Sequence, residues 1–181
     1  EWESRPSPRD DTGETLLKGR GMAYVKYELR RTYVAGVADV ELDRNSGEIR
    51  VTRFHVTHDC GQIINPVGVQ SQIEGNVIQT TSRTLMEELT FDRSMVTSLD
   101  WATYPILRFD AVPEVVIDLI DRPDEPPWGA GEPACAIVSA AIANAVFDAA
   151  GIRLRSVPFK PATVRTALKE AATRASASSS A

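Results

Sequence analysis

Apolar and β-branched residues recur in short runs along the first third of the chain, and they predict three strands. The runs cover residues 22–30, 33–42 and 48–59. Val and Tyr, which favour strands, are frequent in the first two runs. In the third run the apolar positions change phase between Val51 and Phe54. Because strand side chains alternate with period two, this change predicts a β-bulge near Thr52 and Arg53.

After residue 65 the apolar period lengthens to that of a helix. Val69, Ile73 and Val77 recur every four residues. Asn65–Pro66 precedes them as an N-cap residue followed by proline in the first helical position. The pattern therefore predicts a helix over 66–88.

The second half adds one strand and two further helices. The strand covers 113–121, an alanine-rich helix covers 133–150 and a short helix covers 162–172. Small residues on every side of 133–150 indicate a helix that is packed closely all round. Strands first and helices later predict an α+β fold, with a mostly antiparallel sheet covered by the two main helices, 66–88 and 133–150.

Both ends of the chain differ in composition from its middle. Residues 1–14 are polar and proline-rich, as linkers often are, and 169–181 form a Ser/Ala-biased tail that we expect to be disordered. The folded part is then 15–168. Because the chain has neither an initiator Met nor a signal peptide, we expect it to be a piece of a longer polypeptide.

Composition and charge disfavour several functional classes. A net charge of −5 argues against nucleic-acid binding, which needs a basic face. No apolar run approaches the roughly 18 residues of a membrane span. Cys60 and Cys135 are too few for a disulfide framework, and their spacing leaves open whether they pair. His55 and His58 would point to opposite faces of a strand, so no metal site is expected there.

The loop Trp128-Gly129-Ala130-Gly131-Glu132-Pro133 is the most informative stretch. Glu132 falls where the helix over 133–150 would have its N-cap, with Pro133 in the first helical position. The helix dipole and free N–H groups favour a carboxylate at such a place. The pattern has two interpretations, a simple helix cap behind a Gly/Pro turn and a carboxylate with a chemical role.

A second signal is a polar stripe on the helix over 66–88. Gln72, Gly75, Asn76 and Gln79 lie at positions i, i+3, i+4 and i+7, which share one helix face. Two amides beside a glycine could hold a polar cofactor through hydrogen bonds. A solvated helix face is the alternative.

Taken in order, these motifs resemble a known family. They are His58-Asp59-Cys60-Gly61, Asn65-Pro66, the run from Gln72 to Gln79, and Gly129-Ala130-Gly131-Glu132-Pro133 at the start of an alanine-rich helix. They resemble the C-terminal part of the molybdenum-binding (large) subunit in the xanthine dehydrogenase and aldehyde oxidase family. Residues 101–109 and Asp121-Arg122-Pro123 resemble the branch that contains the isoquinoline 1-oxidoreductase beta subunit. The resemblance covers roughly residues 19–168.

The resemblance implies a role for each matched residue. Glu132 matches the family's catalytic glutamate, which acts as a general base. The positions expected to contact the cofactor are Gln72, Gly75, Gln79, Ala130 and Gly131. In this family the pterin holds the metal and no protein side chain binds it, so no metal ligand is expected from this chain.

The resemblance also implies a function. It is that of a molybdenum hydroxylase, an oxidoreductase that oxidises N-heteroaromatic or aldehyde substrates with oxygen from water. The implied cofactor is a molybdenum pterin in its cytosine dinucleotide form, and the implied partners are the remainder of the large subunit, a 2Fe-2S subunit or domain and a small-molecule substrate. Because the family's subunit is far longer than 181 residues, we expect the isolated chain to lack cofactor and activity. The alternative is a non-catalytic docking or structural domain of a larger subunit.

Overall fold

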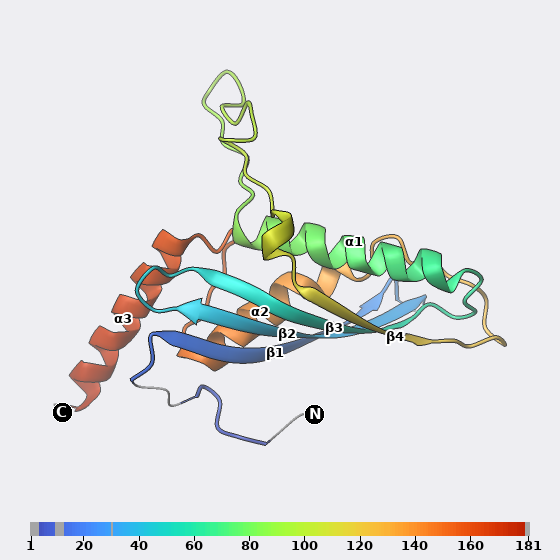
Figure 1. The fold of residues 1–181 in the computed structure, drawn as a ribbon, viewed down its shortest axis with the longest axis horizontal. Helices are drawn as coiled ribbons and strands as arrows, with labels where there is room; N and C mark the ends of the chain where they lie inside the picture. Colours follow the sequence, from blue (N-terminus) through green and yellow to red (C-terminus); the bar gives the residue numbers. More distant parts are fainter. Residues whose placement is uncertain (1–3, 10–12, 30, 180–181) are drawn as a thin grey trace.

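The computed structural model describes residues 4–9, 13–29 and 31–179, and within them one four-stranded sheet carries helices (Figure 1). The strands are β1 (Leu16–Tyr27), β2 (Thr32–Asp43), β3 (Ile49–Asp59) and β4 (Glu114–Ile120), in the spatial order β1-β2-β3-β4. β1, β2 and β3 are antiparallel neighbours, and β4 runs parallel to β3. The expected mostly antiparallel sheet of an α+β fold is confirmed.

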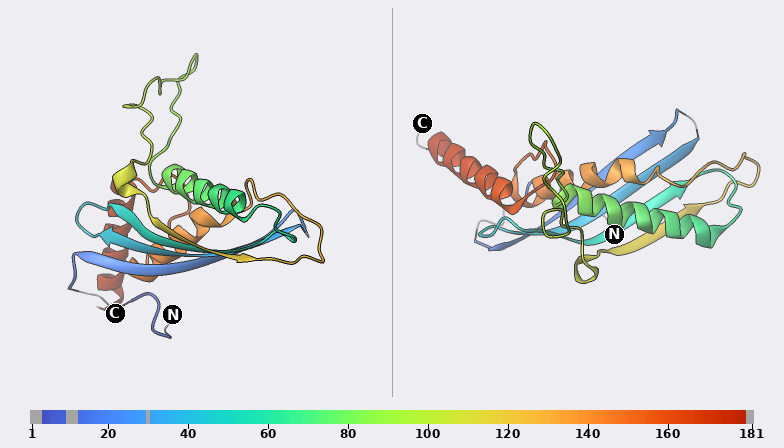
Figure 2. Two further views of the ribbon diagram at one scale, coloured as in Figure 1. Left: turned by 45° about the vertical axis from the view of Figure 1, so that its right-hand side comes forward. Right: turned by 90° about the horizontal axis from the view of Figure 1, so that it is seen from above.

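Three α-helices and one short 3-10 helix complete the fold in the described ranges. The helices are α1 (Pro66–Leu85), α2 (Cys135–Ala150) and α3 (Pro161–Ser179), with the 3-10 helix at Phe109–Ala111. α2 packs on β1 and β2, α1 packs on the β3–β4 side, and the two helices contact each other (Figure 2). A single hydrophobic core joins the sheet to α1 and α2. The two main helices therefore cover the sheet as expected, although α1 ends at Leu85 rather than at residue 88.

The predicted β-bulge is confirmed. Val40 of β2 pairs with Val51, whereas Asp39 pairs with Arg53, so Thr52 is the extra residue. The Thr52 hydroxyl donates a hydrogen bond to the Asp39 carbonyl over 3.2 Å. The insertion returns the next apolar residues of β3 to the core side of the sheet.

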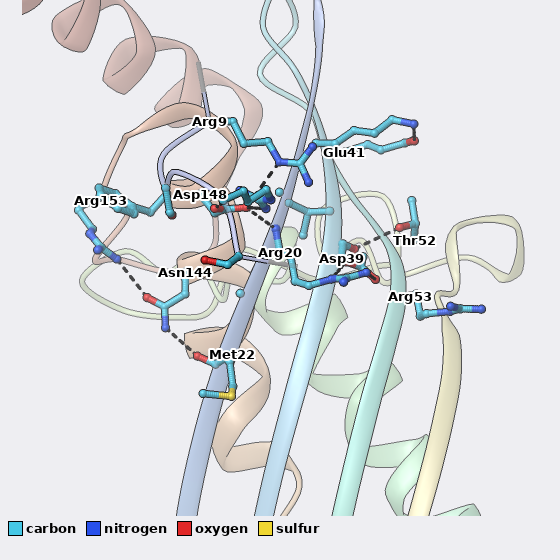
Figure 3. Close-up of a pocket in the computed structure, with 18 of the residues that line it drawn as sticks. Arg9, Arg20, Met22, Asp39, Glu41, Thr52, Arg53, Asn144, Asp148 and Arg153 are labelled. Carbon is cyan, nitrogen blue, oxygen red and sulfur yellow. Dashed lines mark hydrogen bonds and ion pairs between the residues drawn. The ribbon is translucent and has the colours of Figure 1, made fainter. Parts of the chain in front are cut away.

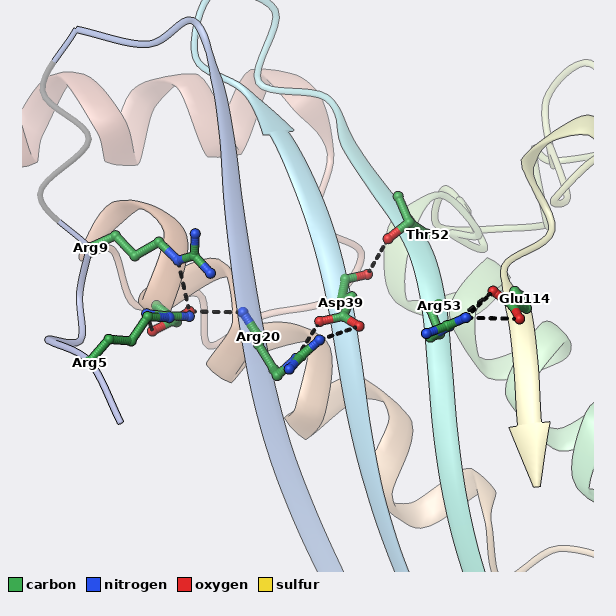
Figure 4. Close-up of polar contacts among 8 residues, drawn as sticks. Arg5, Arg9, Arg20, Asp39, Thr52, Arg53 and Glu114 are labelled. Carbon is green, nitrogen blue, oxygen red and sulfur yellow. Dashed lines mark hydrogen bonds and ion pairs between the residues drawn. The ribbon is translucent and has the colours of Figure 1, made fainter. Parts of the chain in front are cut away.

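Ion pairs join neighbouring strands on the sheet face opposite the core (Figure 4). The Arg20 guanidinium of β1 lies 2.6 Å from the Asp39 carboxylate of β2. Arg53 of β3 pairs with Glu114 of β4 at 2.9 Å. A one-residue slip between β1 and β2 would separate the first pair, and a slip between β3 and β4 would separate the second. Each pair therefore reinforces the register that the core specifies.

β1 begins six residues earlier than expected, because two glycines interrupt its apolar alternation. A Cβ added at Gly19 would lie 2.0 Å from the Ala145 carbonyl oxygen, and one added at Gly21 would lie 2.1 Å from the Ala145 nitrogen. The alanine-rich helix α2 thus rests directly on the backbone of β1. The expected packing all round is wrong, however, since Ala140 and Asn144 are exposed.

The described part of the N-terminal segment, residues 4–9, contacts the end of α2 (Figure 3). Arg5 forms an ion pair with Asp148, and the Arg9 N–H donates to the Asp148 carbonyl over 2.9 Å. Burial would raise the pKa of Asp148, but hydrogen bonds from Arg5 and from the Arg20 backbone N–H hold it below its ordinary value. The carboxylate therefore stays charged among its donors.

The C-terminal segment differs from the expected disorder, because α3 continues to Ser179. Leu168 and Ala171 of α3 pack against the core, and alanine, which is frequent beyond them, favours helix. The segment between α1 and the 3-10 helix at Phe109–Ala111 has no α-helix or long strand among its residues and projects from the body of the fold beyond the end of α1 (Figure 1). No helix in the described ranges is long and apolar enough to cross a membrane.

Candidate cofactor-binding site

Helix α1 begins where the sequence indicates and turns its polar stripe away from the core. The Asn65 side chain accepts a hydrogen bond from the Gly68 N–H over 3.0 Å, and Pro66 is the first helical residue. Ile73 and Val77 are completely buried, whereas Gln72, Gly75 and Gln79 are exposed. The exposed stripe is therefore free to line a binding site.

One open pocket of about 520 Å³ gathers most of the candidate site residues. Helix α1 and the start of α2 line it, with Gln72, Gly75, Asn76, Gln79, Arg83, Gly131, Glu132 and Cys135. Ala130 lies instead in an adjoining pocket of about 380 Å³, which shares Gln72 and Gly131 with the first. The structure thus brings together the two segments that the sequence singled out, although Gln79 and Ala130 are 51 positions apart in the chain.

Glu132 is not the N-cap of α2, so the expected helix start at residue 133 is wrong. The helix begins at Cys135, and its N-cap, Ala134, offers no side-chain hydrogen bond. The exposed Glu132 carboxylate instead accepts a hydrogen bond at Oε1 from the Tyr27 hydroxyl, over 2.8 Å. This hydrogen bond raises the pKa of Tyr27, so the phenol remains a protonated donor at neutral pH.

The loop before Glu132 is tied to the sheet at successive residues. The Trp128 N–H donates to the Cys60 carbonyl over 2.8 Å, and the Thr32 hydroxyl donates to the Gly129 carbonyl over 3.3 Å. Arg31 lies over the Trp128 ring, 5.3 Å from its centroid. These contacts hold the loop against the ends of β2 and β3.

Four residues at the site were not assigned a role from the sequence. Asn76, Arg83 and Cys135 line the pocket, and Tyr27 forms a hydrogen bond with Glu132 beside it. Tyr27 and Glu132 are 105 positions apart, and nothing local relates them. Asn76 belongs to the polar stripe, yet it is buried, and its amide contacts Gly131 and Cys135. Arg83 lies one turn beyond Gln79 on α1 and was hidden by the Thr-Thr-Ser run before it.

The donor set of this pocket fits a polar, anionic cofactor. The amides of Gln72 and Gln79 and the guanidinium of Arg83 are hydrogen-bond donors, and arginine suits phosphate groups in particular. A Cβ built on Gly75 meets no atom within 4 Å in the described part of the chain, so a ligand can approach the helix backbone there. The pocket therefore has both the room and the donors for a pterin cofactor.

The histidines and cysteines form no metal centre, and no cluster of three His, Cys, Asp or Glu side chains occurs among the described residues. His55 is exposed, with Nε2 2.7 Å from an Asp118 carboxylate oxygen, whereas His58 is completely buried. Burial lowers the pKa of His58 to about 4. Cys60 and Cys135 are both free thiols, and burial raises the pKa of Cys60. The expected opposite orientation of the two histidines is confirmed.

Comparisons with known proteins identify the family of the chain. A family model described as the molybdopterin cofactor-binding domain matches residues 6–113. The chain is 45% identical over 175 residues to a nicotinate dehydrogenase subunit of Pseudomonas putida, covering 93% of this chain and 15% of that protein. It is 32% identical over 142 residues to the beta subunit of isoquinoline 1-oxidoreductase from Brevundimonas diminuta, covering 78% of this chain and 18% of that protein.

A solved structure extends the comparison to the fold. Quinoline 2-oxidoreductase from Pseudomonas putida 86 superposes with a TM-score of 0.71 and 31% sequence identity, over 77% of this chain and 19% of that chain. The chain thus spans less than a fifth of the length of each of these relatives. The family model and the relatives confirm the resemblance seen in the sequence, and the chain belongs to the molybdopterin cofactor-binding domain family of xanthine dehydrogenase-type molybdenum-binding subunits.

Proposed function

We propose that this chain forms one wall of the active site of a molybdenum hydroxylase, which oxidises an N-heteroaromatic or aldehyde substrate with oxygen from water. One observation carries the proposal. The Glu132 carboxylate lines the same pocket as Gln72, Gln79 and Arg83 of α1, in a chain whose family binds molybdopterin. The names of the relatives, which concern nicotinate, isoquinoline and quinoline, favour the N-heteroaromatic class.

In this proposal the residues of α1 and of the glycine-rich loop hold the cofactor. Gln72, Gln79 and Arg83 donate hydrogen bonds to it, and Gly75 leaves room for its approach. Ala130 and Gly131 present backbone rather than bulky side chains on the other side. When bound, the molybdenum pterin supplies the redox chemistry, while the protein supplies binding, orientation and proton transfer.

Glu132 is the general base of this mechanism. The Tyr27 hydroxyl holds Oε1, and Glu132 has no other side-chain hydrogen bond within the described ranges, so Oε2 remains available to take a proton from the attacking oxygen. The loop contacts of Trp128 and Gly129 limit how far the carboxylate can move. A carboxylate that is held on one oxygen and open on the other suits this role.

We further propose the cytosine dinucleotide form of the pterin, together with two protein partners, the remainder of the large subunit and a 2Fe-2S subunit or domain. The short span of this chain relative to its relatives supports the first partner, and the names of those relatives, which describe them as subunits, support assembly with others. In this proposal residues 15–168 are a C-terminal part of the cofactor-binding domain. Release of cytidine monophosphate on hydrolysis of the extracted cofactor would establish the nucleotide.

The test is Glu132→Gln in the full-length enzyme, assayed with a pyridine carboxylate and with an aromatic aldehyde in ¹⁸O-labelled water. We expect unchanged molybdenum content and a turnover lower by about 10²–10⁴-fold, the contribution typical of a general base. Glu125→Gln is the matched control, because it makes the same change in the same loop at a residue whose side chain forms an ion pair only with Arg122 among the described residues. Near-normal turnover of Glu132→Gln with molybdenum bound would refute the role of Glu132. A full-length protein without molybdenum would favour the docking or structural alternative.

A further inference from the structure

Asn76 lies at the contact between α1, the glycine-rich loop and α2, and it is only 6% exposed. Its amide nitrogen donates to the carbonyl of Gln72 over 2.6 Å and to that of Gly131 over 2.8 Å. Its amide oxygen accepts from the Cys135 N–H over 3.1 Å and from the Cys135 thiol over 2.9 Å. One side chain of α1 therefore satisfies backbone groups on both sides of Glu132.

These contacts supply a side-chain cap that the start of α2 lacks in its own sequence. The first N–H groups of a helix have no partner within the helix, and a side chain at the N-cap normally accepts from one of them. Ala134, the N-cap of α2, makes no such hydrogen bond. The Cys135 N–H is shared between the Glu132 carbonyl, at 3.0 Å, and the side-chain oxygen of Asn76, at 3.1 Å and 59 positions earlier. The start of α2 is thus held by its own first turn and by α1 together.

We propose that Asn76 is a positioning residue, which fixes the backbone of residues 131–135 so that the Glu132 carboxylate faces the cofactor pocket. This inference rests on the proposed function of Glu132. Gly131 directly precedes Glu132, and Cys135 follows it by one turn, so the two contacts set both ends of the segment. The Tyr27 hydroxyl then fixes the carboxylate itself.

The chemistry of the amide group matters here, not only its size. The Gly131 carbonyl needs a donor and the Cys135 N–H needs an acceptor, and asparagine offers both from one short side chain. Aspartate has nearly the same shape, but when ionised it only accepts. Asn76→Asp therefore separates the two contacts, because it keeps the helix-capping acceptor and places a carboxylate oxygen against the Gly131 carbonyl.

The experiment compares Asn76→Asp with the unaltered full-length enzyme. We expect the same molybdenum content and a kcat per molybdenum lower by about 10–100-fold, as a displacement of about 1 Å can cause. Amide hydrogen exchange in residues 129–132 should be faster by at least about 10-fold, as expected when a loop loses its anchor. A protonated carboxyl can donate again, so the ratio of the variant's kcat to that of the unaltered enzyme should rise as the pH falls. A residue with only a structural role would not produce this pH-dependent recovery.

Asn144→Asp is the matched control (Figure 3). The Asn144 amide of α2 also donates to a backbone carbonyl of another element, that of Met22 on β1, over 2.9 Å, but it lies away from the pocket. Asn144→Asp should leave kcat and amide hydrogen exchange in residues 129–132 unchanged. Should Asn76→Asp not fold, Asn76→Ala removes both contacts without adding charge, and it should also lower kcat and speed exchange.

Each outcome decides the question. The inference would be overturned if Asn76→Asp left both kcat per molybdenum and amide hydrogen exchange unchanged. It would also be overturned if the variant lost molybdenum but kept the same kcat per molybdenum. The proposed function fails separately, through unimpaired turnover of Glu132→Gln, and the exchange measurement then still reports whether Asn76 holds the loop. Asn76→Asp should slow turnover little further when Glu132 is already glutamine, since the two substitutions then affect the same step.

Discussion

Replacing Gly75 with alanine should stabilise the 181-residue chain and yet lower the molybdenum content of the full-length enzyme. Gly75 lies inside α1, where glycine is about 0.5–1 kcal/mol less favourable than alanine. A Cβ built on it meets no atom within 4 Å anywhere in the described ranges. The added methyl group therefore brings the gain in helix propensity without a steric cost.

The expected shift is measurable by urea unfolding followed by far-UV circular dichroism. With a slope of about 2 kcal/mol per molar urea, a gain of about 0.5–1 kcal/mol raises the unfolding midpoint by about 0.3–0.5 M. Gly21→Ala is the matched control, because its Cβ would lie 2.1 Å from the Ala145 nitrogen. That substitution should lower the midpoint, since overpacking costs about 1–3 kcal/mol.

The second half of the prediction concerns the cofactor. In the full-length enzyme the methyl group projects into the pocket that Gln72 and Gln79 line, where we propose that the pterin approaches the helix. Molybdenum content should therefore fall while stability rises. A lower unfolding midpoint in Gly75→Ala would show that the helix face is assigned wrongly, and full molybdenum content would show that the cofactor binds elsewhere.

Two further predictions test the core. Ile73→Ala should lower the free energy of unfolding by about 2–5 kcal/mol, because Ile73 is completely buried. Gln72→Ala, on the exposed side of the helix, should change it by less than about 0.5 kcal/mol. Equal effects of the two substitutions in urea unfolding would contradict the assignment of the helix faces. His58 binds a proton more readily when unfolded, so stability should fall as the pH drops from 6.5 towards 4, by up to about 3 kcal/mol. His58→Leu should remove this part of the pH dependence, and an unchanged profile would contradict it.

The sequence predicts best where local chemistry decides the structure. Asn65 and Pro66 fix the start of α1 through a side-chain cap and a preset backbone angle, both within one turn. The bulge at Thr52 shows in the same way, because the phase of the apolar residues changes within a single strand. The polar stripe of α1, from Gln72 to Gln79, follows from helix periodicity alone.

Prediction from the sequence fails where the local structure depends on contacts with residues far away in the chain. Glu132 and Pro133 have the composition of a helix start, yet α2 begins at Cys135, where Asn76 of α1 supplies the only side-chain acceptor among the described residues. Residues Gly19 and Gly21 look like breaks in β1, but they are the positions at which α2 approaches the strand. Neither contact leaves a local trace, since each depends on two elements being packed together.

Strand β1 takes part both in the packing of α2 on the sheet and in the contact with Glu132. Gly21 and Tyr27 lie on the same strand, about 20 Å apart at the usual rise per residue. Gly21 sets how closely α2 approaches the sheet, and Tyr27 holds the carboxylate of Glu132, which stands just before α2. The backbone that carries Glu132 and the hydroxyl that orients it are therefore both placed relative to one strand. A core glycine far from the pocket thus contributes to the geometry of the proposed base, because packed interiors transmit displacement rather than absorb it.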